Sequence, residues 1–197
     1  FVKCQRDHNS VRGVGGVALF IRKNENCSIT PIHIPSSEHI IAVKLTNYHQ
    51  TLYIIGVRLP SSNVLDSAYM EEMYSAMETY DCCSAQGETI LLGDFNADLR
   101  CCVPPKPRAK YLHRALTERN LVSVVPLDNP ALYTYASKCR NITTMLDYIF
   151  IDCDYRRNMV GFDIDTFVPY NVSDHLPVFV YLCHDKPVPQ FRSTHLN

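Results

Sequence analysis

Residues 89–97 form the sequence Thr-Ile-Leu-Leu-Gly-Asp-Phe-Asn-Ala, in which a short apolar run is followed at once by an acid and an amide. The run predicts a buried strand, and Gly93 marks the point where it ends. Because side chains alternate along an extended chain, Asp94 and Asn96 are expected on one face, with Phe95 turned back to the core. A carboxylate beside a carboxamide can hold a water molecule between an acceptor and a donor, which suits the positioning of a nucleophile. Taken alone, the same residues fit a polar strand end entering a turn equally well.

Five further short runs, rich in valine, isoleucine, tyrosine and phenylalanine, also predict buried strands. They cover residues 16–21, 40–45, 52–57, 146–151 and 177–182. The polar connection 46–51 predicts a hairpin between the second and third of these runs. Residues 65–80 and 109–119 carry apolar side chains at three- and four-residue spacing and predict two helices, the second with Leu112, Ala115 and Leu116 on one side. Strands in series with two helices between them favour an α/β sandwich over alternating βαβ units.

The composition is that of a single globular domain. The 197 residues are 46% hydrophobic and 20% charged with only seven glycines, which excludes collagen-like and low-complexity chains. The formal net charge of −1 predicts no nucleic-acid or membrane partner, so any such contact must come from a local patch. No apolar run reaches the roughly 18–20 residues that span a bilayer. Residues 1–183 are expected to form the domain, and the polar, proline-punctuated residues 184–197 a linker or tail.

The nine cysteines include two vicinal pairs and no C-x-x-C motif. An odd count and adjacent cysteines make a poor disulfide framework. We therefore interpret them as reduced thiols of an intracellular protein, located in the nucleus or the cytoplasm. Three Asn-x-Ser/Thr tripeptides argue for secretion only weakly, because such tripeptides arise readily by chance.

Two further polar groups stand at the entrances of apolar strands. Asp174 and His175 follow Ser173 just before the last strand, and they offer a metal- or water-binding oxygen and a protonatable ring. A positioned imidazolium can neutralise charge that grows on a phosphoryl oxygen. Asp147 opens another apolar strand, where an acid is costly unless it is paired, and a histidine is the expected partner. Considered as a solitary pair, Asp-His is more often a surface turn than a site.

Three motifs, in this order at the ends of apolar strands, resemble the endonuclease/exonuclease/phosphatase superfamily: GDFNA at 93–97, LDYIF at 146–150 and SDHLPV at 173–178. Three upstream stretches resemble the AP-endonuclease-like domain of non-LTR retrotransposons: RGVGGVALFI at 12–21, SEHIIAVKL at 37–45 and YIIGVRLPSS at 53–62. The resemblance extends over about residues 10–183. It implies a four-layer αββα sandwich of the DNase I-like type and Mg²⁺-dependent hydrolysis of a DNA phosphodiester, with a reverse transcriptase as a neighbouring domain of the parent polypeptide.

The resemblance also implies a role for each matching residue. Asp94 would orient or deprotonate the attacking water, and Asn96 would bind that water or a phosphate oxygen. His175 would contact the scissile phosphate and stabilise its transition state, with Asp147 fixing the ring. Asp174 would serve at the metal side, where Mg²⁺, or Mn²⁺ in its place, acts as a Lewis acid and stabilises the leaving group.

The chain departs from the family pattern at two points. The family's opening strand–helix–strand part carries an asparagine and the metal-binding glutamate, and it is expected to precede Phe1. Glu38 and Glu88 sit in no matching motif, so metal binding is expected to be impaired. Arg58 stands where the family usually has a phosphate-contacting tyrosine, two residues before a proline. Arginine can reach a phosphate, but it cannot reproduce a phenol.

Local charge supplies candidate DNA contacts, for which a solvated basic surface is an equally good interpretation. They are Arg100, Lys106, Arg108, Lys110, Arg156 and Arg157. Two other functions remain open. One is a catalytically silent remnant that acts only as a binding domain. The other is a superfamily phosphatase on inositol phosphates or lipids, which is disfavoured because that branch usually carries a tryptophan-containing motif and this chain has no tryptophan.

Overall fold

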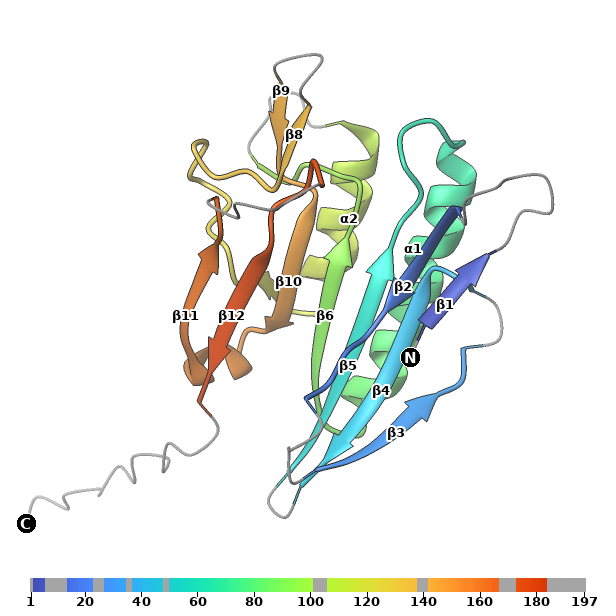
Figure 1. The fold of residues 1–197 in the computed structure, drawn as a ribbon, viewed down its shortest axis with the longest axis vertical. Coiled ribbons are helices and arrows are strands. Elements are labelled where there is room, and N and C mark those ends of the chain that lie inside the picture. Colours follow the sequence, from blue (N-terminus) through green and yellow to red (C-terminus); the bar gives the residue numbers. More distant parts are fainter. Residues whose placement is uncertain are drawn as a thin grey trace, which may run out of the picture.

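A six-stranded sheet forms the centre of the fold, with its strands in the spatial order β3-β4-β5-β6-β10-β7 (Figure 1). The strands are β3 (Ser28–Ile32), β4 (Ile40–Thr46), β5 (Thr51–Arg58), β6 (Glu88–Asp94), β7 (Leu121–Ser123) and β10 (Asp147–Asp152). Neighbouring strands are antiparallel except β5 and β6, which run parallel because α1 (Asp66–Ser84) crosses over between them. The computed structural model describes residues 2–5, 14–22, 27–34, 37–47, 50–100, 106–137, 142–166 and 173–183.

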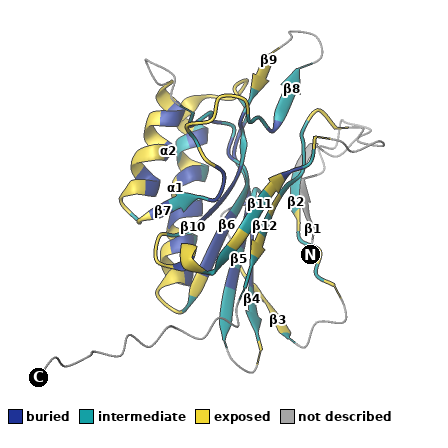
Figure 2. Cartoon of the chain, turned by 90° about the vertical axis from the view of Figure 1, so that its left-hand side faces the viewer, coloured by how far each residue is buried: buried dark blue, intermediate teal, exposed yellow. Residues whose placement is uncertain are grey.

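Two helices, α1 and α2 (Pro107–Thr117), cover one face of the central sheet (Figure 2). They confirm the helices predicted over 65–80 and 109–119, with shifted ends. The buried face of α1 carries Tyr69, Met73 and Met77 together with Tyr80, so the methionine spacing marks a core contact. α2 buries Leu112, Ala115 and Leu116 as the sequence predicts.

Two strand pairs lie over the opposite face of the central sheet (Figure 2). They are β1 (Val2–Gln5) with β2 (Val14–Ala18), and β11 (Met159–Ile164) with β12 (Val178–Leu182). The layers pack closely, because a Cβ atom added to Gly56 of β5 would lie 3.2 Å from Val17 of β2. Helices, central sheet and strand pairs form the α/β sandwich that the sequence predicts. In the part of the chain that the structure describes, no α-helix covers the outer side of the strand pairs.

The pairing of β4 with β5 confirms the predicted hairpin, with Leu45 opposite Leu52. The first predicted strand is shifted, because β2 ends at Ala18 whereas the apolar run continues to residue 21. The predicted tail, residues 184–197, lies outside the described residues. No helix among the described residues is long and apolar enough to cross a membrane.

Two small elements mark the two ends of the sheet (Figure 1). The hairpin of β8 (Tyr135–Ser137) and β9 (Ile142–Thr144) projects beyond the end at which β6 finishes and β10 begins. The short 3-10 helix η1 (Tyr155–Asn158) follows β10 at the other end. The end with the β8–β9 hairpin carries the polar residues that the sequence motifs single out.

Candidate functional site

Strand register places three charged residues in one row at the end of the central sheet. Arg58, the last residue of β5, lies beside Asp94, the last residue of β6. On the other side of Asp94 lies Asp147, the first residue of β10. Residues in one row of a sheet point to the same face, and neighbouring strands are about 4.8 Å apart. The row therefore brings two carboxylates and one guanidinium together.

A tight turn, and not strand alternation, joins Asn96 to Asp94. The backbone of Asn96 has φ 46°, a left-handed conformation that asparagine tolerates, so the predicted extended geometry is wrong at this residue. The Asn96 backbone N–H donates to Asp94 Oδ1 at 3.0 Å, and Asn96 Nδ2 donates to Asp94 Oδ2 at 2.8 Å. Nδ2 also donates to the Leu59 carbonyl at 2.8 Å. Because both N–H groups of the amide already donate to acceptors, Oδ1 is the amide atom that can accept a hydrogen bond from water.

His175 is held on Asp147, as the sequence predicts for a histidine partner. His175 Nδ1 lies 2.8 Å from Asp147 Oδ2. The backbone N–H of His175 donates to Ser173 Oγ at 3.0 Å, and this bond stabilises the loop that carries His175. The Tyr135 ring stands edge-on to the imidazole, with the ring centroids 5.1 Å apart. These contacts fix both the hydrogen-bonded edge and the tilt of the ring.

Burial and neighbouring charge shift the pKa values of both Asp94 and His175 upward. The pKa of Asp94 is raised first by burial and then by the charge of Asp147, against smaller lowering effects of the Asn96 N–H, His175 and Arg58. The pKa of His175 is raised above 6.5, chiefly by its hydrogen bond to Asp147. Asp94 is thereby a better proton acceptor than an exposed aspartate, and His175 holds a proton more readily than a free imidazole.

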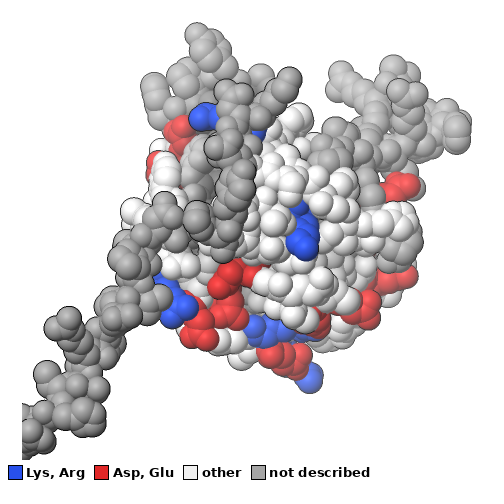
Figure 3. All heavy atoms as spheres, turned by 90° about the horizontal axis from the view of Figure 1, so that it is seen from below, with Lys and Arg blue, Asp and Glu red and all other residues white. Residues whose placement is uncertain are grey.

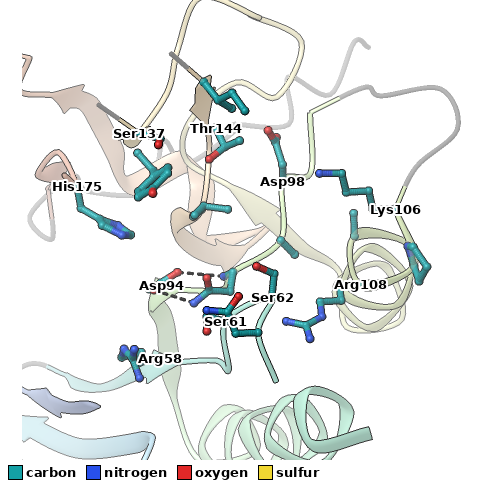
Figure 4. A pocket seen from close by; sticks show the side chains of 18 of the residues that line it. Arg58, Ser61, Ser62, Asp94, Asp98, Lys106, Arg108, Ser137, Thr144 and His175 are labelled. Atoms are coloured by element: carbon teal, nitrogen blue, oxygen red, sulfur yellow. Dashed lines mark hydrogen bonds between the residues drawn. The ribbon is translucent and has the colours of Figure 1, made fainter. Parts of the chain in front are cut away.

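These residues open onto a cavity of about 790 Å³ (Figure 4). Its wall combines the Arg58–Asp94–His175 side with the loop Ser61–Asn63, the start of α2 at Lys106 and the β8–β9 hairpin. Asp147 lies behind His175 and Asp174 is exposed, and neither lines this cavity. The structure therefore brings Asp94, Asn96, Asp147 and His175 together with Arg58, and it leaves Asp174 outside the group.

Two of the predicted DNA contacts are internal structural residues. The Arg100 side chain is only 14% exposed, pairs with Asp98 and donates to the Leu132 carbonyl at 2.7 Å. The guanidinium of Arg108 pairs with Asp66 at 2.6 Å and donates to two backbone carbonyls of the loop before α1. Because these charges are satisfied inside the protein, neither arginine is free to bind a phosphate.

Arg156 and Arg157 lie in η1, at the end of the sheet opposite to Asp147. β10 separates them from the site by six residues, or roughly 17 Å at the rise of an extended chain. Figure 3 views this opposite end and shows lysines and arginines mixed with acidic residues, without a continuous basic surface. These two arginines therefore lie away from the group formed by Asp94, Asp147 and His175, and their role as DNA contacts stays a prediction.

The described side chains do not complete a metal site. The described ranges contain no group of three or more histidine, cysteine, aspartate or glutamate side chains that could hold a metal ion. Asp94 and Asp147 offer the oxygen atoms that Mg²⁺ prefers. However, both oxygens of Asp94 accept hydrogen bonds from Asn96, and Asp147 Oδ2 is hydrogen-bonded to His175. The residues present therefore do not fit a fully protein-held Mg²⁺.

Comparisons with known proteins identify the fold. No protein-family model matches the sequence, and a search of curated proteins gives no match. The endonuclease domain of TRAS1, a telomere-specific non-LTR retrotransposon, superposes with a TM-score of 0.68 at 14% identity, covering 94% of this chain and 81% of that one. A 3'-5' exonuclease from Neisseria meningitidis gives 0.61 at 17% identity, covering 81% and 71% of the two chains. An AP endonuclease from Archaeoglobus fulgidus gives 0.57 at 16%, covering 80% and 70%. The chain thus shares the DNase I-like fold of these nuclease structures.

Proposed function

We propose that this chain, with its nuclease fold, hydrolyses a phosphodiester bond of DNA as the endonuclease domain of a non-LTR retrotransposon. The observation that carries the proposal is the strand register that sets Asp147 directly opposite Asp94, with His175 bonded to Asp147. This arrangement provides a proton acceptor and a cationic donor on one cavity wall, which hydrolysis of a phosphodiester requires. The names of the similar structures, all nucleases, support the same reaction class.

Asp94 accepts the proton of the attacking water in this proposal. Its raised pKa favours proton uptake, and its two oxygens are oriented by the backbone and side-chain N–H groups of Asn96. Asn96 Oδ1 accepts a hydrogen bond from the other O–H of the same water. The water is thereby held between the carboxylate and the carboxamide, with its lone pair directed away from both.

His175 stabilises the charge that develops on the phosphoryl oxygens. Asp147 holds Nδ1, so the ring presents Nε2–H toward the cavity that His175 lines. The hydrogen bond to Asp147 raises the pKa of His175 and so favours the cationic ring, and a fixed cation aimed at a developing oxyanion lowers the barrier. Asp147 therefore acts through His175 and does not touch the substrate.

A divalent metal belongs to the proposal, with Mg²⁺ first and Mn²⁺ as a substitute, and Asp174 on the metal side. The described side chains do not complete its ligand set, so the steps above are assigned to the protein's own groups. The same incomplete ligand set favours the second candidate, a silent domain that binds DNA without cleaving it. A reverse transcriptase in the parent polypeptide belongs to the first candidate alone.

Nicking of supercoiled plasmid decides between the two candidates. The endonuclease proposal predicts that the purified chain nicks plasmid in Mg²⁺ and stops when EDTA removes the metal, whereas the incomplete ligand set of the silent domain predicts no nicking. His175→Gln is expected to lower the rate by about 100-fold or more, because it removes the cationic donor. His113→Gln, at an exposed residue of α2, is the matched control and should leave the rate unchanged. DNA binding without nicking in Mg²⁺ or Mn²⁺ would establish the silent domain.

DNA binding should depend on Arg58 and Lys106, because both line the cavity and no ion pair holds either side chain among the described residues. The plot of log affinity against log salt is expected to become shallower by roughly 0.9 for each of Arg58→Gln and Lys106→Gln on duplex DNA, or by roughly 0.7 on a single strand. Fluorescence anisotropy in EDTA measures this slope without cleavage. Arg156→Gln and Arg157→Gln, at the far end of the sheet, are the charge-matched controls. Slopes that change equally in all four variants would contradict the assignment.

A further inference from the structure

Thr134 is a fully buried polar residue next to the candidate site, and the sequence motifs do not include it. Its Oγ1 accepts hydrogen bonds from the backbone N–H groups of Leu146 and Asp147, each at 3.0 Å. A hydroxyl oxygen has two lone pairs, so these two bonds use its full acceptor capacity. One hydroxyl group therefore holds the two backbone N–H groups at the start of β10, in addition to the pairing of β10 with β6.

The backbone around Thr134 also bonds to the segment that carries His175, the partner of Asp147. The Thr134 carbonyl accepts the Leu176 N–H at 2.7 Å, and the Ala136 N–H donates to the Asp174 carbonyl at 3.0 Å. These two bonds flank His175, which pairs with Tyr135 between them. One short segment, 134–136, thus contacts the backbone on both sides of the Asp147–His175 hydrogen bond.

We propose that Thr134 is a positioning residue, whose hydroxyl sets the distance between Asp147 and His175. The proposal rests on the proposed function only for its catalytic consequence. Asp147 and His175 lie 28 positions apart in the chain, so no local geometry joins them. Thr134 is anchored to the His175 loop through its backbone and to the start of β10 through its side chain. The hydroxyl is therefore the part of this link that a single substitution can remove.

Two substitutions separate the hydroxyl from the rest of the side chain. Thr134→Val keeps the shape and removes the acceptor, while Thr134→Ser keeps the acceptor and removes a methyl group. Thr89→Val is the matched control, because Thr89 is also buried in the central sheet and its Oγ1 bonds to the Gly87 carbonyl at the opposite end of β6. Thermal midpoints of all three variants measure the purely structural cost of each change.

The first measurement is the NMR signal of the His175 Nδ1 proton, identified by its absence in His175→Gln. This signal reports the hydrogen bond to Asp147 without substrate, so it stays informative even for a chain that cleaves nothing. We expect the signal to shift or vanish in Thr134→Val and to persist in Thr134→Ser and Thr89→Val. An unchanged signal in folded Thr134→Val would overturn the proposal, whatever the outcome for nuclease activity.

The second measurement is steady-state cleavage of a DNA oligonucleotide. Thr134→Val is expected to lower kcat about tenfold or more with KM within twofold, because substrate binding does not use this hydroxyl. Thr134→Ser should restore kcat to within about threefold of the parent. An equal loss of kcat in Thr134→Val and Thr89→Val would mean that Thr134 has only a structural role, and it would overturn the positioning role. Absence of cleavage by the parent chain would count against the proposed function, and the proton signal alone would then decide the role of Thr134.

Discussion

Asp94→Asn is expected to reduce DNA nicking by about 100- to 10,000-fold, the contribution typical of a general base. The substitution keeps the size of the side chain and removes its ability to take a proton from water. Asp94 lies between Arg58 and Asp147 in the row. The other carboxylates that line this cavity, Asp66 and Asp98, are paired with Arg108 and Arg100, so neither is placed to replace Asp94. Rates from plasmid nicking under single-turnover conditions measure the loss directly.

The same variant should fold at least as well as the parent. Asp94 and Asp147 carry like charges in adjacent strands, and neutralising one of them removes that repulsion. Asp152→Asn, at the other end of β10, is the matched control and should leave nicking unchanged. If Asp94→Asn nicked at the parental rate with an unchanged thermal midpoint, Asp94 could not be the proton acceptor.

The sequence predicts the strands that carry the site because each is an apolar run with a polar end. β4, β5, β6 and β10 contain buried residues, and β12 alternates half-buried with exposed residues. Their polar ends are prominent in the sequence because a charge that terminates a buried strand must be paired or exposed. This argument predicts a histidine partner for Asp147, and the family resemblance identifies that histidine as His175.

The same argument does not predict the short strands. β7, β8 and β9 have three residues each, which is too few to display a period of two. β3 is mostly exposed and contains Pro31, so it lacks an apolar run. Thr134 precedes β8 directly, and only the long-range hydrogen bonds of the folded chain reveal its contacts with β10.

The role of each arginine also depends on tertiary contacts. Arg108 bonds to Asp66 and to backbone atoms 42 to 48 positions away, and Arg100 bonds to carbonyls about 30 positions away. The residues around Arg108 include Lys106 and Lys110 and no nearby acid, so its charge looks available for DNA in the sequence. Of the arginines and lysines that line the cavity, Arg108 is paired with Asp66. Arg58 and Lys106 are the other two, and they lie on different sides of Asp94 (Figure 4).

Gly93→Ala is expected to cost more than about 4 kcal/mol of unfolding free energy, enough to prevent folding of many single domains. Gly93 has φ +138°, a conformation that is essentially restricted to glycine. A Cβ atom at this position would lie 1.9 Å from the Val57 carbonyl oxygen, well inside contact distance. That oxygen belongs to β5, which is paired on both sides by β4 and β6 and cannot move away. Urea denaturation followed by circular dichroism measures the change.

Gly161→Ala is the matched control for this effect. Gly161 also lies in a strand, but the nearest atom to its added Cβ is Tyr181 Cδ2 at 3.9 Å, an ordinary van der Waals contact. Its cost is expected to stay within about 1 kcal/mol. Equal denaturation midpoints for the two variants would mean that β5 and β6 can separate at this point. The row of Arg58, Asp94 and Asp147 would then not be fixed by the sheet, because the close approach at Gly93 is what sets Asp94 beside Arg58.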